Sequence, residues 1–308
     1  MSARAEDPGG PAPTGDPGDG ALPVSEMIRR RLPELPRAER QVGRALLVRS
    51  PTIGLESSLR LAEIVGTSGP TVIRFVNRLG FATYAAFQSA WREELDARLV
   101  SPVDSYERYE PESDATRRVT RTVETALQTI RQTLEQLPPE ELEAAIELLA
   151  TRRRVLVFGG WFSHVLARHL VALLHGVRPG VELLEQPPGE RSAALVDACK
   201  HDVAVVFDFR RYEQDTLVAA RHLADRRARI VLVTDQWVSP IAGLASSVLI
   251  ARTGPPGPLE SLASATVLVE ALVAAVVDRL GPEVRGRIEQ LAEISATLIP
   301  NWQPPGGD

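Results

Sequence analysis

The chain is poor in residues that form disulfides or bind metals. Among its 308 residues there are one cysteine, Cys199, and five histidines. A single cysteine excludes an internal disulfide and a cysteine-based zinc site. We therefore expect no metal site and no cofactor, and we expect Cys199 to be a small buried residue.

Long hydrophobic runs are also lacking. No apolar stretch reaches about 18 residues without a polar interruption, the length that a membrane-spanning helix needs. The nearest candidate, residues 263–277, contains Ser264, Thr266 and Glu270. The N-terminus has no basic segment followed by a hydrophobic run. These absences predict a soluble, cytoplasmic protein that does not enter a membrane.

Lysine is nearly absent, and the remaining charge is spread unevenly. Lys200 is the single lysine, and the formal net charge is −5. Residues 22–100 contain 12 Arg against 8 Asp and Glu, a net charge of +4, whereas residues 1–21 carry −3 and residues 101–308 carry −6. A basic region in an acidic chain is typical of one domain that meets nucleic-acid phosphate and another that does not.

Within the basic region, residues 58–80 predict two short helices joined by a tight turn. Ser58 is expected to cap the first helix and Ser68 the second, while Gly66 supplies the positive φ that ends the first. Pro70 suits a first helical turn, and Gly80 ends the second helix. This spacing is typical of a DNA-reading helix-turn-helix.

The second of these helices has an apolar side and a polar side. Val72, Phe75, Val76 and Leu79 recur at helical spacing and are expected to face a core. The opposite side would then read base edges and phosphates. The predicted DNA-binding residues are Ser68, Gly69, Thr71, Arg74, Asn77 and Arg78. The alternative is an ordinary amphipathic helix with a solvated basic face.

Composition divides the chain into five segments. Residues 1–21, rich in Pro, Gly and Asp, cannot offset the entropy of ordering and are expected to be disordered. Residues 22–100 read as a domain of about five short helices, and residues 101–113 as a linker. Residues 114–285 form the second domain, and residues 286–308 a C-terminal extension.

In the second domain, two helices are followed by short apolar runs that alternate with helical stretches. The predicted strands are 155–158, 181–184, 203–209, 230–234 and 248–250, with a long helix over 259–280. Continuous β-branched runs fit strands covered on both faces, so the fold class is α/β, a doubly wound parallel-sheet sandwich behind an all-α domain. In such sheets, ligands bind beyond the carboxyl ends of the strands.

With both halves in view, the chain resembles the RpiR (MurR/RpiR) transcriptional regulators. That family joins an N-terminal helix-turn-helix to a flavodoxin-like sugar isomerase (SIS) domain that senses phosphosugars. The resemblance covers about residues 25–285 and is most specific at Leu61-Ala62, Gly66-Thr67-Ser68, Thr71-Val72-Ile73-Arg74-Phe75 and Leu79-Gly80-Phe81. It implies a regulator rather than an enzyme, which binds double-stranded DNA as a homodimer or homotetramer under the control of a small anionic effector, a phosphosugar or sugar acid.

The second loop of the SIS half departs from the family pattern. Residues 208–213, Asp-Phe-Arg-Arg-Tyr-Glu, replace the usual Ser-x-Ser-Gly-x-Thr phosphate cradle. Arg210 and Arg211 bind an anion through their guanidinium groups, pair with Asp208 and Glu213, or lie at a subunit interface. The predicted effector-binding residues are Gly160, Trp161, Ser163, Asp208, Arg210, Arg211, Tyr212 and Ser261.

Several of these assignments have alternatives. Ser163 and Ser261 stand near helix starts, where a hydroxyl either contacts a ligand or caps the helix. An SIS-type isomerase would need a base such as Glu260, Glu213 or His164, but none lies in a recognisable catalytic pattern. A further alternative is a regulator whose SIS domain only oligomerises.

Overall fold

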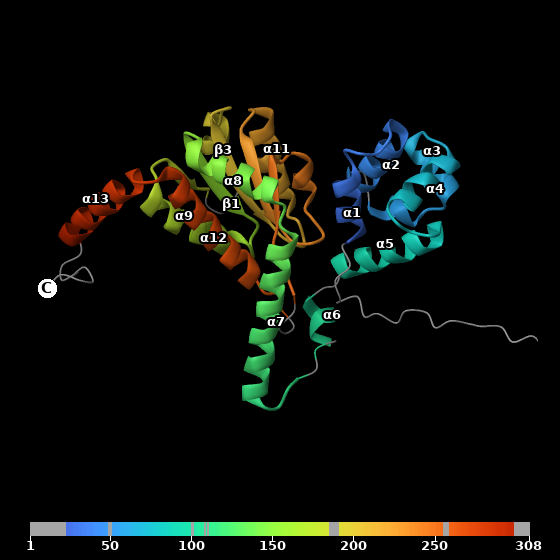
Figure 1. The fold of residues 1–308 in the computed structure, drawn as a ribbon, viewed down its shortest axis with the longest axis horizontal. Helices are drawn as coiled ribbons and strands as arrows, with labels where there is room; N and C mark the ends of the chain where they lie inside the picture. The colour runs from blue at the N-terminus through green and yellow to red at the C-terminus, as the bar shows by residue number, and fades with distance from the viewer. Residues whose placement is uncertain are drawn as a thin grey trace, which may run out of the picture.

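The computed structural model describes residues 23–48, 51–99, 102–107, 109, 111–184, 191–254 and 259–298. The predicted N-terminal tail, residues 1–21, lies outside the described residues. Within them the chain forms a helical half and an α/β sandwich, in agreement with the predicted fold class (Figure 1).

The helical half contains five helices around one core. They are α1 (Val24–Arg31), α2 (Arg37–Val48), α3 (Ser58–Val65), α4 (Gly69–Arg78) and α5 (Tyr84–Leu99), with a 3-10 helix η1 (Pro51–Leu55) between α2 and α3. The core is built on aromatic residues: Phe87 stacks on Trp91, with ring centroids 6.0 Å apart, and Phe75 is fully buried. The apolar positions that recur at helical spacing face this core. The five helices predicted from that spacing are all found among the described residues.

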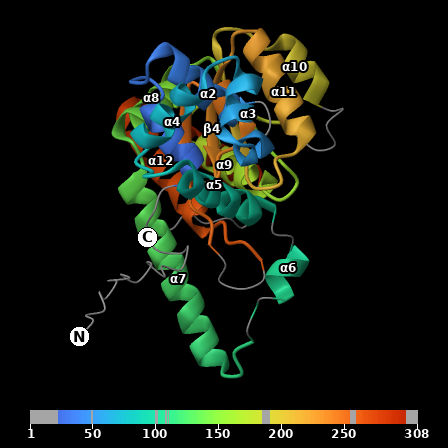
Figure 2. The same cartoon turned by 90° about the vertical axis from the view of Figure 1, so that its right-hand side faces the viewer.

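The segment predicted as a linker includes a short helix. This helix is α6 (Pro102–Glu107), and α7 (Ala115–Gln136) follows it. Asp114 caps α7, since its carboxylate accepts hydrogen bonds from the backbone N–H groups of Thr116 and Arg117. Helix α7 extends away from the sandwich in both views, with its C-terminal part against α12 (Figures 1 and 2).

The second half is a three-layer sandwich around a five-stranded parallel sheet with the order β2-β1-β3-β4-β5. The strands are β1 (Arg154–Gly159), β2 (Val181–Leu183), β3 (Asp202–Asp208), β4 (Arg229–Thr234) and β5 (Ser247–Ile250). The helices are α8 (Pro139–Thr151), α9 (His164–Val177), α10 (Ser192–Asp197), α11 (Gln214–Asp225), η3 (Pro240–Gly243), α12 (Ala263–Leu280) and α13 (Glu283–Leu298).

Alternation along the strands explains the two covered faces. Val155 and Val157 of β1 join one core with α8, α9 and α12, whereas Leu156 and Phe158 join a second core with α10, α11 and η3. Since neighbouring residues of a strand point to opposite faces, a fully buried strand needs apolar residues at every position. This requirement is why the strands read as unbroken apolar runs.

Some boundaries differ from the prediction. The long C-terminal helix begins at Ala263 rather than at residue 259, and α13 occupies much of the predicted extension. The short elements η1, α10 and η3 were not predicted, because a few residues carry too little periodicity. Cys199 is half-buried rather than buried.

The halves are in contact among the described residues: α2 lies against η3, and arginines of α1 reach the second half. The Arg29 side chain of α1 donates a hydrogen bond to the backbone carbonyl of Val238, over 3.5 Å, in the loop between β4 and η3. Arg30 donates to the carbonyl of Gln136 at the end of α7, over 3.3 Å. The loop that contacts Arg29 follows the carboxyl end of β4, so the helical half lies beside that edge of the sheet, next to the sandwich in Figure 1.

No helix among the described residues is both long and apolar enough to cross a bilayer. In the same part of the chain, no three or more His, Cys, Asp or Glu side chains gather as a metal site would require.

Candidate functional site

The turn between α3 and α4 is built from capping residues and glycine. Ser57, and not Ser58 as predicted, caps α3, because its hydroxyl accepts a hydrogen bond from the backbone N–H of Arg60 at 3.2 Å. Gly66 ends α3 at φ 76°, as predicted, and Gly80 follows α4 at φ 102°. Ser68 is at the N-cap position of α4, but its hydroxyl pairs with the Thr71 hydroxyl at 2.9 Å rather than with the backbone.

Helix α4 exposes most of the residues predicted to meet DNA. Its core side consists of Val72, Phe75 and Val76, all fully buried. Thr71 was predicted to face outward, but it is buried, and its hydroxyl lies between Ser68 and the Arg74 guanidinium. We define the recognition face as the outward side of α4 that carries Ser68, Gly69, Arg74, Asn77 and Arg78.

The two arginines of the recognition face share one buried carboxylate. Glu39 of α2 has 5% of its side chain exposed and lies 2.8 Å from Arg78 Nε and 3.8 Å from Arg74 Nε. Arg74 and Arg78 keep 61% and 55% of their side chains exposed. Two guanidinium groups against one carboxylate leave a positive charge on an accessible surface, which suits binding to a phosphate backbone.

The second candidate site lies at the carboxyl ends of β1, β3 and β4, where sheets of this kind form their ligand crevice, and we call this site the crevice. The strand order reverses between β1 and β3, where doubly wound sheets bind their ligands. Three loops line this crevice: residues 160–163 after β1, residues 209–213 after β3, and residues 235–239 after β4.

The loop after β1 is held against β3. The Ser163 hydroxyl donates to the carbonyl of Phe207 at 2.7 Å and is buried. A Cβ at Gly159 would lie 3.0 Å from the same carbonyl, so close packing favours glycine there. Ser163 thus joins two strand ends rather than capping α9, whereas Trp161 beside it is 78% exposed.

Glu213 reaches across the crevice from the loop after β3. Its carboxylate accepts a hydrogen bond from the backbone N–H of Trp161 over 2.6 Å. A Cβ at Gly160 would lie 2.9 Å from the same carboxylate, so a glycine leaves the room that this contact needs. The sequence left open a pairing of Glu213 with Arg210 and Arg211, and the contact that the structure gives Glu213 is with a backbone amide of the loop after β1.

Asp208 and Asp235 form the buried acidic floor of the crevice. Asp208 accepts a hydrogen bond from the Ser239 hydroxyl, and burial raises the pKa of Asp208 to about 7, with further contributions from the charges of Asp235 and Glu213. Burial also raises the pKa of Asp235, opposed by hydrogen bonds from Tyr212 Oη at 2.6 Å and from the backbone N–H groups of Arg210 and Trp237.

The two arginines of this loop have different surroundings. Arg210 forms an ion pair with Glu260, and its guanidinium lies 4.8 Å from the Trp237 ring centroid. Burial lowers the pKa of Arg210, and the nearby Asp235 opposes the change. Arg211 is exposed, at φ 90°, and Tyr212 follows at φ 33°. Glu260 was predicted in the first turn of the last long helix, but it precedes that helix and pairs with Arg210 instead.

The remaining predicted residue, Ser261, lies just before α12 and makes a hydrogen bond at the start of that helix. Its hydroxyl accepts from the backbone N–H of Ala263 at 3.2 Å. The structure therefore brings Gly160, Trp161, Asp208, Arg210 and Tyr212 to one crevice.

Sequence reasoning missed Arg191, which has 1% of its side chain exposed and donates to the carbonyl of Gly159 over 3.2 Å. Arg191 also lies 3.7 Å from Asp215 in an ion pair, and burial lowers its pKa. The signal available beforehand was weak, because no pattern links residue 191 to a strand end more than thirty residues earlier. Asp235 was within a predicted site loop but was not chosen, and Glu39 was not considered.

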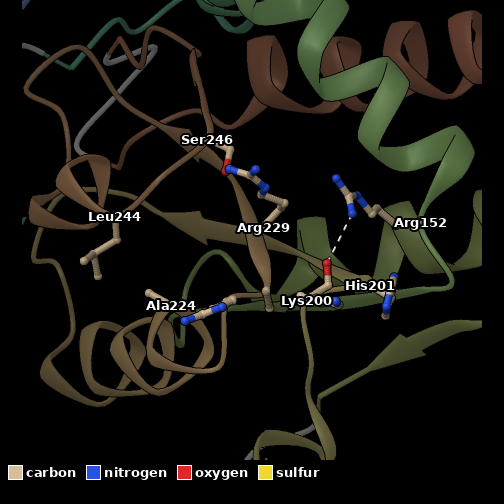
Figure 3. Close-up of a pocket in the computed structure, with 9 residues that line it drawn as sticks. Arg152, Lys200, His201, Ala224, Arg229, Leu244 and Ser246 are labelled. Atoms are coloured by element: carbon tan, nitrogen blue, oxygen red, sulfur yellow. Dashed lines mark hydrogen bonds between the residues drawn. The ribbon is translucent and has the colours of Figure 1, made fainter.

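A hollow of about 670 Å³ lies at the opposite, amino-terminal edge of the sheet (Figure 3). Its basic residues come from segments that precede β1, β3 and β4: Arg152, Lys200, His201, Arg227 and Arg229. Arg152 donates to the carbonyl of Lys200 at 3.2 Å (Figure 3), and α8 and α11 end here, where cations stabilise the negative ends of helices. This hollow is distinct from the crevice.

Comparison with known proteins agrees with the architecture. The family model of the SIS domain matches residues 148–275, so the α/β half contains an SIS domain. No curated protein sequence matches the chain.

The chain is also similar to solved structures. The sugar isomerase domain of an RpiR transcription factor from Sphaerobacter thermophilus is similar at 26% identity and a TM-score of 0.54, covering 56% of this chain and 97% of that one. The Vibrio vulnificus NanR protein, complexed with ManNAc-6P, is similar at 18% identity and a TM-score of 0.54, covering 90% of this chain and all of the other. At that identity the second likeness shows the fold alone.

Proposed function

We propose that this chain is a DNA-binding transcriptional regulator of the RpiR type, whose SIS domain binds a small anionic effector in the crevice. The observation that carries the proposal is the helix-turn-helix over α3 and α4, which presents two exposed arginines on a domain of its own. Its neighbour is an SIS domain similar to that of an RpiR transcription factor.

The DNA-binding part rests on the recognition face. Arg74, Asn77 and Arg78 would enter the major groove, with Ser68 and Gly69 near phosphate. Thr71 would act from beneath, since its hydroxyl accepts from Arg74 at 3.1 Å and helps to orient that side chain. Two copies would read half-sites about one helical turn apart, roughly 34 Å, or a multiple of this distance.

The effector part rests on the crevice at the switch point of the sheet. Arg210 and the backbone N–H of Trp161 are donors suited to a phosphate or carboxylate group. The NanR protein of the same fold is complexed with ManNAc-6P, which is a phosphosugar. A phosphosugar or a sugar acid is therefore our proposed effector.

Communication between the two sites would run through the loop after β4. Asp235 accepts a hydrogen bond from Tyr212 in the loop after β3. Three residues later, the carbonyl of Val238 accepts one from Arg29 of the helical half. An effector that prefers one arrangement of this loop would shift the balance between two placements of the helical half, by no more than its difference in affinity for them.

Exposed apolar residues support a homo-oligomer. Helix α7 exposes Val119, Val123 and Leu127 at helical spacing, and α13 exposes Ile288 and Ile294. Such stripes on helices of a water-exposed surface are typical of protein interfaces. We propose that a second copy of the chain covers them, as a homodimer or homotetramer.

The test measures DNA binding and effector binding separately on the full chain. Selection of duplexes from a random pool, followed by fluorescence anisotropy, should yield an operator that wild type binds and the Arg74→Ala, Arg78→Ala double variant does not. A thermal-shift panel of phosphosugars, sugar acids and unphosphorylated sugars should show stabilisation of about 2.7 kcal/mol at 100 times the dissociation constant. Failure to bind any duplex at low salt would contradict the regulator proposal.

One observation favours a second candidate, a regulator whose SIS domain only oligomerises. The cations Arg210 and Arg191 of the crevice already pair with Glu260 and Asp215. If no compound of the thermal-shift panel stabilises the protein while operator binding is intact, this second candidate is supported. Turnover of any sugar phosphate would instead indicate an SIS-type isomerase. Of the bases considered for that activity, Glu213 and Glu260 are already engaged with donors of the chain.

A further inference from the structure

Three groups of the crevice that could bind an anion already contact carboxylates of the chain itself. The backbone N–H of Trp161 donates to Glu213, Arg210 pairs with Glu260, and Arg191 lies 3.7 Å from Asp215. Each of these three donors already meets an internal anion, while Arg211 of the same loop as Arg210 is exposed. An anionic ligand held by any of the three must therefore exchange with its internal partner.

Among these carboxylates, Glu213 is the one placed to exchange. It is at the N-cap position of α11, yet its side chain makes no capping hydrogen bond to that helix. Instead it crosses the switch point to the loop after β1, where the absence of a Cβ at Gly160 makes room for it. Glu213 is hydrogen-bonded to a neutral backbone amide, whereas Glu260 and Asp215 form ion pairs with Arg210 and Arg191.

The Trp161 N–H favours an anionic acceptor over a neutral one, and the acidic floor repels Glu213 as it would repel the anionic group that replaces it. Asp208 and Asp235 form the floor, and the Trp161 N–H is a single donor directed at the crevice. A neutral sugar hydroxyl would give a weaker hydrogen bond than the carboxylate it displaces. A phosphate brings more charge and three oxygens, and thus competes where a hydroxyl does not.

We infer that Glu213 is an internal competitor at the effector site: its carboxylate occupies the place of the effector's anionic group, and the effector displaces it from the Trp161 N–H. Glu213 thereby sets both the affinity of the crevice and its preference for phosphorylated over neutral sugars. This inference rests on the proposed function, because it assigns a role within the same crevice. The Glu213 contact closes the site, so the apparent affinity equals the intrinsic affinity multiplied by the fraction of molecules in which this contact is open.

The experiment removes the competitor and measures anion binding directly. Full-length wild type, Glu213→Gln and Glu213→Ala are titrated with inorganic phosphate and with glucose 6-phosphate, by calorimetry and by following the backbone amide resonance of Trp161. Glu124→Gln, an exposed position on α7, is the matched control. We expect Glu213→Ala to bind both probes about tenfold more tightly than wild type, which corresponds to about 1.4 kcal/mol. The Trp161 resonance should move on substitution and again on adding phosphate.

Two results would overturn the inference. Equal or weaker binding in both Glu213 variants would show that Glu213 contacts the ligand or only supports the loop. A Trp161 resonance that responds to neither substitution nor phosphate would show that no anion binds at this amide. Loss of operator binding in wild type would contradict the regulator proposal without touching these titrations, so the two failures are distinguishable.

Discussion

Arg74 and Arg78 on the recognition face keep 61% and 55% of their side chains exposed, whereas Arg210 in the crevice keeps 14%. The first two share a single carboxylate, Glu39, while Arg210 has Glu260 to itself and a Trp237 ring beneath it. Exposure together with an unequal charge count leaves the recognition face ready for a polyanion. Burial with matched charges in the crevice means that a ligand at the proposed effector site would compete with an internal partner.

The largest expected effect is the loss of operator binding on removing both exposed arginines. Each base-reading arginine is worth about 1–3 kcal/mol, so Arg74→Ala with Arg78→Ala should cost about 2–6 kcal/mol in operator affinity. A side chain that meets phosphate would instead reduce the salt slope. Anisotropy at several salt concentrations separates these cases, with the exposed Arg226→Ala of the other half as control. Unchanged operator affinity in the double variant would refute the assignment of the recognition face.

The buried arginine should matter to stability rather than to DNA. Arg210→Ala leaves Glu260 and the Trp237 ring without their partner, which should lower the free energy of unfolding by about 1–3 kcal/mol. Arg211→Ala is a stringent control, since Arg211 is adjacent in sequence but exposed. Urea unfolding measures both, and a double-mutant cycle with Glu260→Ala isolates the ion pair. Equal losses at positions 210 and 211 would mean that burial does not distinguish them.

The acidic floor of the crevice should make stability depend on pH. Burial raises the pKa of Asp208 from 3.8 to about 7, so the folded protein holds a proton that the unfolded chain releases within this window. Stability therefore falls as the pH rises from about 4 to about 7, by up to about 1.4 kcal/mol per pH unit. Below about pH 4 the full stability remains, because both the folded and the unfolded chain hold the proton. Asp208→Asn, which keeps an acceptor for Ser239, should flatten the dependence of Tm on pH. An equally steep profile in the variant would contradict the assignment.

The smallest predicted effect concerns the carboxylate under the recognition face. Glu39→Gln removes the negative charge that Arg74 and Arg78 share, so non-specific affinity for DNA at low salt should rise, by less than about tenfold, and depend more steeply on salt. Glu63→Gln, exposed on α3 and paired with Arg60, is the control. A decrease in affinity would show that Glu39 acts by holding the arginines in place rather than by neutralising them.

Periodicity predicted the elements well and the contacts between them poorly. The apolar positions of α4 and the unbroken strands follow from local pattern, since burial on one face or on both leaves a repeating signature. Thr71 was placed outward because it lies at the edge of the apolar stripe, where a hydroxyl pair with Ser68 and the overlying Arg74 bury it. Its position depends on side-chain contacts rather than on helical spacing alone.

The crevice shows the same limit over longer distances. The loops after β1, β3 and β4 were predicted as the ligand edge, because parallel strands all end there. Which charges pair within it was not predictable: Glu213 meets an amide 52 residues away, and Arg210 meets Glu260 rather than its neighbours. Pairings of this kind depend on loop geometry, which apolar periodicity does not encode.

Val238 gives the contact between the halves a mechanical character. This β-branched residue is buried and held at φ 56°, a conformation that costs a residue of its type on the order of 1–3 kcal/mol. The carbonyl that accepts the hydrogen bond from Arg29 thus belongs to a residue with a strained backbone. Any rearrangement that returns Val238 to a negative φ would recover that free energy. The contact between the helical half and the sandwich thus includes a residue in a strained backbone conformation.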